Sequence, residues 1–224
     1  MLRLILFVGW ICAISALIAM AIGHSGEHDL HWTANQISSY AAGAPHGNWI
    51  TASMLLSVMT LFILSLLFSR FKVFGEHVLI SMVPLVAGSA IGGLLVLARY
   101  QETARTVTLL KSAGYATIRQ QSFHDTGLLI FYFSSIALTM SLGLIAITTQ
   151  RHWLRKAVGL VIFSAGPISL VLMRTAWPGL VGAVGNNTGL KQRAALLCLW
   201  FAFVLVLALA SMQVRATGRA TEVR

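Results

Sequence analysis

The sequence predicts an all-α membrane protein, a six-transmembrane helical bundle that uses residues 1–224 as one domain. Of the 224 residues, 57% are hydrophobic and only 10% are charged, against about 25% charged residues in an ordinary soluble domain. The charges cluster between apolar runs, and each run is long enough to cross the roughly 30 Å hydrocarbon core of a bilayer. The predicted spans are residues 4–22, 49–68, 78–98, 126–149, 157–173 and 194–214.

The first apolar run, 4–22, follows Arg3 and is predicted to stay in the membrane as a helix. Ala19-Met20-Ala21 matches the small-residue pattern of a signal-peptide cleavage site, so cleavage is the alternative. A signal peptide usually has an apolar core of about 7–15 residues, and this run is longer. We therefore expect the first span to be retained.

The second and third spans carry interface and packing signals. Trp49 opens the second span and suits the membrane interface, and Arg70 and Lys72 follow its end. The third span contains Gly88-x-x-x-Gly92, and small residues at this spacing let helices approach closely. These two glycines predict packing within the chain or against a partner, either another membrane protein or a second copy.

The last three spans complete the bundle. His124 and Asp125 precede the fourth span, and the fifth contains Gly166-Pro167, which is expected to bend it. The sixth leads into a polar tail, 215–224, which we expect to be flexible.

Six spans place both termini on one side of the membrane, and the distribution of positive charge predicts that this side is the cytoplasm. The short connections on the terminal side carry Arg70, Lys72, Arg151, Arg155 and Lys156. Short basic loops favour the cytoplasmic side. The long connections 23–48, 99–125 and 174–193 are then three outer loops. We expect them to form the functional face, since sites usually lie on loops held by a rigid scaffold.

The net charge of +10 does not indicate a nucleic-acid partner. The basic residues are scattered among loops and form no basic face or nucleic-acid motif. Cys12 and Cys198 lie inside apolar runs at different depths, so we expect them to pack as small apolar residues rather than form a disulfide.

The first outer loop holds the densest group of candidate metal ligands. His24, His28 and His31 share one face if the first helix continues past the membrane surface. With His124 from the start of the fourth span, they predict a divalent metal such as zinc, which imidazole and carboxylate ligands suit. The alternative is that the nearby glycines end the helix and the histidines are ordinary interfacial loop residues.

Three residues are candidates for catalysis beside such a metal. Asp125 or Glu27 would orient a ligand or act as a general base. Ser38 is a candidate nucleophile on the same face. No G-x-S-x-G elbow supports a serine hydrolase, and Ser38 alternatively caps a helix or lies at the interface.

Three basic residues, Arg174, Lys191 and Arg193, frame the last outer loop and are candidates for binding lipid phosphate. The alternative is that they anchor helix ends at the interface. No charged residue lies in the middle of a span, which argues against an ion-coupled transporter.

Short motifs over about residues 30–210 resemble the bacterial DUF998 membrane proteins, a family defined by sequence with no settled activity. The motifs are Ile37-Ser38-Ser39-Tyr40-Ala41 with Gly43, His124 with small residues after it, and Gly189-Leu190-Lys191-Gln192-Arg193 running into Leu199-Trp200. The chain departs from the family at 99–102, where a turn with proline and acid is expected. The resemblance implies a six-helix bundle and singles out Ser38, Tyr40, His124 and Arg193, but it brings no reaction.

Taken together, these features favour a non-catalytic accessory or lipid-binding subunit in the plasma (inner) membrane of a bacterium. The basis is the lack of a mid-span charge, a strong motif or a cofactor box. The alternative is an outer-face, metal-dependent hydrolase that acts on a lipid-like substrate. The predicted partners are the lipid bilayer and either a membrane protein or a second copy of the chain.

Overall fold

The computed structural model describes residues 1–25, 46–69, 82, 84–96, 118–150, 152–176 and 188–222. Within 68–69, 118–125, 175–176, 188 and 215–222 it describes only the path of the backbone. Over the described part of the chain the protein is all-helical, as the sequence predicts. The helices are α1 (Leu2–Gly23), α3 (Gly47–Ser69), the Pro84–Val96 helix, α5 (Ile118–Thr149), α6 (Trp153–Ala176) and α8 (Thr188–Glu222).

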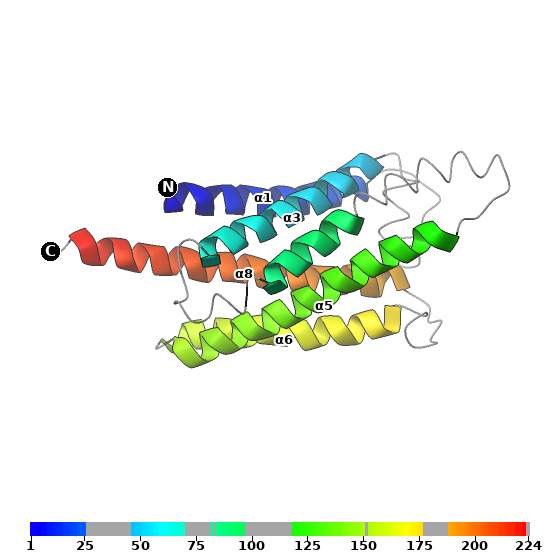
Figure 1. Cartoon of the computed structure of the whole chain (residues 1–224). Coiled ribbons are helices and arrows are strands. Elements are labelled where there is room, and N and C mark those ends of the chain that lie inside the picture. The colour runs from blue at the N-terminus through cyan, green and yellow to red at the C-terminus, as the bar shows by residue number, and fades with distance from the viewer. Residues whose placement is uncertain are drawn as a thin grey trace.

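The helices lie side by side, and each described helix runs antiparallel to the next (Figure 1). The start of α1 and the end of α8 lie at the same end of the bundle, which we call the terminal end. The opposite end, where α1 ends and α8 begins, is called the loop end below. It also holds the start of α3, the start of α5 and the end of α6.

Five of the described helices are long and apolar enough to cross a membrane, and the Pro84–Val96 helix is a shorter apolar helix. Their outward faces carry large apolar side chains: Phe7 is 61% exposed, Phe133 55% and Val171 62%. Such faces are costly in water and suit lipid tails. The protein is therefore a multi-pass integral membrane protein.

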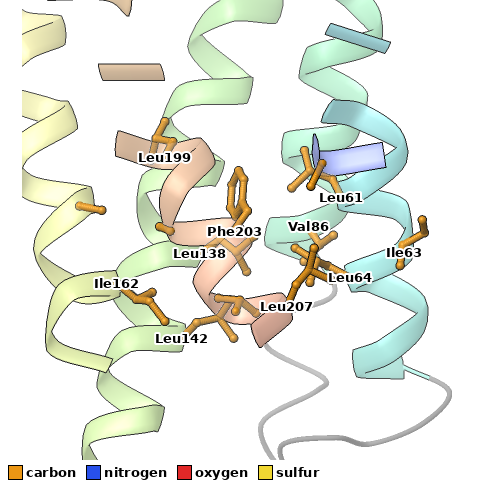
Figure 2. Packing of buried hydrophobic residues seen from close by; sticks show 14 of the residues in the cluster. Leu61, Ile63, Leu64, Val86, Leu138, Leu142, Ile162, Leu199, Phe203 and Leu207 are labelled. Carbon is orange, nitrogen blue, oxygen red and sulfur yellow. The ribbon is translucent and has the colours of Figure 1, made fainter. Parts of the chain in front are cut away.

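The core lies around α8. Figure 2 shows Phe203 and Leu207 of α8 between the leucines of α5 and those of α3. Leu64, Leu138 and Leu207 have no exposed surface. Because α8 contacts all the other labelled helices, its position fixes the spacing of the bundle.

Helix α1 packs through a face of small residues, namely Gly9, Cys12, Ala13, Ala16, Ala19 and Gly23. A Cβ atom at Gly9 would lie 3.0 Å from a methyl carbon of Ile63, so α1 and α3 approach closely. Ser53 of α3 donates a buried hydrogen bond of 2.6 Å to the Ala16 carbonyl. Ala19, in the candidate cleavage site, is buried by this packing. Retention of the first span stays a prediction.

The glycine pair on the third predicted span packs within the chain. A Cβ atom at Gly92 would meet the backbone nitrogen of Phe131 and the carbonyl oxygen of Gly127, both on α5. Next to this contact, the Ser135 hydroxyl of α5 donates to the Ser89 hydroxyl at 3.0 Å. The Gly88/Gly92 spacing left open whether this helix packs within the chain or against a partner. In the structure both glycines pack against α5 of the same chain.

Two helices extend beyond the predicted spans. Helix α5 begins at Ile118 rather than near 126, so His124 and Asp125 lie on its helical path. Helix α8 continues to Glu222, over most of the tail that we expected to be flexible. The added segments contain Arg, Gln, Ala and Glu, which favour helix, and no proline. Apolar runs mark the membrane boundary, whereas a helix ends where its backbone preference ends.

Candidate functional site at the loop end

The loop end is organised by a hydrogen bond between Arg193 of α8 and His24, the residue that caps the end of α1. The Arg193 Nε donates to the His24 Nε2 at 3.0 Å. The His24 Nδ1 lies 2.8 Å from the Met20 carbonyl oxygen. Arginine has donors only, so Nε2 is the acceptor and Nδ1 carries the proton, which it donates to Met20. In this arrangement His24 is a neutral imidazole that positions a cation.

Local structure explains why His24 stands at this point. A Cβ atom at Gly23 would meet Ile50, so the last turn of α1 lies directly against α3. The His24 backbone N–H closes this turn onto Met20 and Ala21. The carbonyl groups at the end of a helix carry partial negative charge, which favours a cation such as Arg193 beside them.

The other two candidate anion-binding residues also lie at the loop end. Arg174 is exposed near the end of α6, whereas Lys191 and Arg193 are half-buried in the first turns of α8. Ser169 of α6 donates a buried hydrogen bond of 3.1 Å to the Ala195 carbonyl of α8, which ties these two helices together. The structure therefore brings the three predicted basic residues to one end of the bundle.

Sequence reasoning missed two buried polar residues, Gln192 and Tyr132. Gln192 is 8% exposed and adjoins Arg193. Tyr132 of α5 is 2% exposed, and its hydroxyl has no hydrogen-bond partner among the described residues. The available signal for Tyr132 was a single hydroxyl in the aromatic run 131–133, whose other members are phenylalanine.

Most of the predicted metal and catalytic residues lie outside the described part of the chain, namely Glu27, His28, His31 and Ser38, and so does Tyr40, which the DUF998 resemblance singles out. For His124 and Asp125 only the helical path is described, and it brings them to the loop end. Among the described residues, no group of three or more His, Cys, Asp or Glu side chains could hold a metal. Both His24 ring nitrogens are engaged, so binding a metal would require one of these contacts to be replaced. The metal site stays a prediction.

Comparisons with protein-family models, with curated proteins and with solved structures find no match for this chain. The resemblance to the DUF998 family stays a prediction, and the function proposed below is based on the geometry of the loop end.

The chemistry available at this end is that of anion recognition. A guanidinium group carries a permanent charge and presents N–H donors in a planar arrangement that matches phosphate oxygens. Arg193 is half-buried, where its electrostatic attraction is less screened than on an open surface. Large apolar side chains continue directly from this end along the outer faces of the helices, so charge recognition and lipid contact adjoin.

Proposed function

We propose that the protein is a non-catalytic, lipid-binding membrane subunit that holds the phosphate headgroup of an anionic phospholipid at the loop end. The observation that carries the proposal is the Arg193–His24 hydrogen bond, which fixes a half-buried cation where α1 and α8 meet. A cation held in position before the ligand arrives loses less side-chain entropy on binding. Lys191 and Arg174 would add attraction for the same headgroup from α8 and α6.

The same proposal includes the topology. The chain has six spans with both termini in the cytoplasm, and the Pro84–Val96 helix forms the centre of the span predicted at 78–98. Support comes from the antiparallel order of the described helices and from the shared end of α1 and α8 (Figure 1). The loop end then faces the outside of a bacterial plasma membrane. Membership of the DUF998 family, and a membrane-protein partner or second copy, belong to this proposal as well.

Native mass spectrometry of the detergent-purified protein tests the lipid site. After exposure to equal amounts of phosphatidylglycerol and phosphatidylcholine, the parent protein is expected to retain phosphatidylglycerol preferentially. Arg193→Gln removes the charge and keeps a long polar side chain, so it should lower this preference about 10-fold or more, since hydrogen bonds to charged groups contribute about 1.5–3 kcal/mol.

The matched control is Arg155→Gln, because Arg155 lies at the opposite end of the bundle, in the first turn of α6. This variant should keep the preference of the parent. Equal loss in both variants would indicate a general effect of net charge, and no preference in the parent would remove the proposed function.

The alternative function is an outer-face, metal-dependent hydrolase for a lipid-like substrate. The observation that favours it is that His24, exposed His46 and the segment of α5 that holds His124 and Asp125 lie at the same end. Elemental mass spectrometry of untagged protein tests it against a His28→Ala, His124→Ala double variant. About one equivalent of zinc in the parent that is lost in the variant would favour the hydrolase, and its absence from both would remove it.

A further inference from the structure

Helix α8 is covered by neighbouring helices on three of its sides. On one side Arg193 bonds to His24 of α1. On another, the Ala195 carbonyl accepts a hydrogen bond from Ser169 of α6. On the inner side, Phe203 packs between the leucines of α3 and those of α5 (Figure 2). These contacts assign three sides of α8 to its neighbours in the bundle.

The fourth side of α8 exposes large apolar residues. Leu190 is 37% exposed, Leu197 50% and Phe201 51%. Their spacing of seven and then four residues places them on one helical face, which we call the outer face of α8. At about 3.6 residues per turn, this face lies between the side that holds Arg193 and the side that holds Ala195. The outer face of α8 therefore contacts lipid between α1 and α6.

Cations lie on both sides of the outer face at the loop end. Arg193 lies on the α1 side, where its bond to His24 holds it. Lys191 is about one turn before Ala195 and so lies on the α6 side, where Arg174 is exposed near the end of α6. Long basic side chains at helix ends can extend their charge to the membrane interface. A phosphate over the loop end of the outer face is therefore attracted from both sides.

The outer face continues from these cations into the hydrocarbon region. Leu197 lies about 6 Å and Phe201 about 12 Å beyond Arg193 along the helix axis. One leaflet contributes roughly 15 Å of hydrocarbon. A phospholipid with its phosphate at Arg193 thus has an acyl chain long enough to cover Leu197 and Phe201. Because these two side chains are exposed, the lipid can arrive from the surrounding leaflet while the bundle stays closed.

We propose that the anionic phospholipid binds on the outer face of α8, between α1 and α6, and is reached laterally from the leaflet at the loop end. Its phosphate lies between Arg193 and Lys191, and an acyl chain covers Leu197 and Phe201. This inference rests on the proposed lipid-binding function and names the ligand as a lipid resident in the membrane rather than a soluble phosphate. Exchange of one lipid for another on this face leaves the apolar contact unchanged, so the charged headgroup determines which lipid stays.

Photocrosslinking from the acyl chain tests the proposal. The full-length protein is placed in phosphatidylcholine nanodiscs that contain a trace of phosphatidylglycerol or phosphatidylcholine, each with the same photoreactive group in the middle of one acyl chain. The phosphatidylcholine probe reports the contact that any lipid makes with an exposed apolar face. The ratio of phosphatidylglycerol to phosphatidylcholine adducts, mapped by peptide mass spectrometry, then reports selection by the headgroup.

The parent protein is expected to show a ratio about 10-fold higher at Leu197 and Phe201 than at Phe133, as a hydrogen bond to a charged group would give. Phe133 is the matched reference because it is 55% exposed on α5, in the half of the bundle nearer the loop end. Arg193→Gln and Lys191→Gln should each lower the ratio on α8, whereas Arg155→Gln should not. Unchanged phosphatidylcholine adducts show that each variant keeps its fold.

The outcomes separate this inference from the function on which it rests. If the parent retains phosphatidylglycerol preferentially but its adduct ratio is the same on α8 as at Phe133, the function stands and the outer-face site fails. If no preference is found by either method, both fail. An unchanged ratio in Lys191→Gln would contradict contact with the headgroup from two sides. Loss of the enrichment on adding inorganic phosphate would show that the site binds a free anion, which would also overturn the inference.

Discussion

At the scale of single residues, His24 and Arg193 are joined although they are 169 positions apart in the sequence. The bond uses an acceptor at the end of α1 and a donor near the start of α8, so it closes the bundle between its first and last described helices. Trp10 makes a similar connection nearer the terminal end, where its indole Nε1 donates to the Ser211 hydroxyl at 3.1 Å. These contacts fix the depth of α1 relative to α8.

A double-mutant cycle measures this coupling. We expect His24→Leu to lower the free energy of unfolding by about 1–3 kcal/mol, because the Arg193 Nε loses its acceptor. The double variant, His24→Leu with Arg193→Met, should lose less free energy of unfolding than the sum of the two single losses. The difference should be at least about 0.5 kcal/mol. Denaturant unfolding in detergent provides the measurement. Additive losses would show that the two side chains do not interact.

At the scale of helices, glycine and alanine determine how closely neighbours approach. Gly92 lies against the α5 backbone, whereas Gly88 faces the Ser134 side chain. A backbone cannot move aside as a side chain can, so these two glycines of one motif should tolerate substitution differently.

We expect Gly92→Ala to destabilise the protein by about 1–3 kcal/mol, since the added methyl group overlaps backbone atoms of α5. Gly88→Ala is the matched control and should cost less, because the Ser134 hydroxyl can rotate away. The free energies of unfolding of both variants, measured in the same detergent, test this order. Equal costs would contradict the close contact at Gly92.

At the scale of the whole molecule, the arrangement predicts opposite accessibility for the two ends of the bundle. A cysteine-free background is available through Cys12→Ala and Cys198→Ala, because both cysteines are unpaired in the structure. In that background, Ser25→Cys at the loop end should react with a membrane-impermeant maleimide in intact cells. Thr221→Cys, near the end of α8, should react only after the cells are opened. The reverse pattern would invert the proposed orientation.

The sequence predicts the helices better than it predicts where they end or which neighbours they contact. Apolar runs predict the helices because every residue in a bilayer must be apolar or paired. They did not predict the start of α5 at Ile118 or the end of α8 at Glu222, because helices continue past the membrane where propensity allows. The partner of Gly92 was undecided, since spacing reveals a close contact without naming the second helix.

The candidate site was predictable only in part. Arg193 was expected to bind an anion, and His24 to bind a metal, but no local pattern predicts that they contact each other. Tyr132 was missed because a tyrosine between two phenylalanines fits an ordinary apolar helix face. Only its burial and its lack of a partner among the described residues distinguish it.

The most direct test of the central claim is to locate the bound lipid. A phosphatidylglycerol with a photoreactive group beside its phosphate is equilibrated with the protein in nanodiscs, crosslinked by light and mapped by peptide mass spectrometry. The account predicts adducts near Arg193 and His24 at the loop end, and their loss in Arg193→Gln but not in Arg155→Gln. Adducts confined to the terminal end, or spread evenly over the exposed helix faces, would contradict a lipid site organised by Arg193.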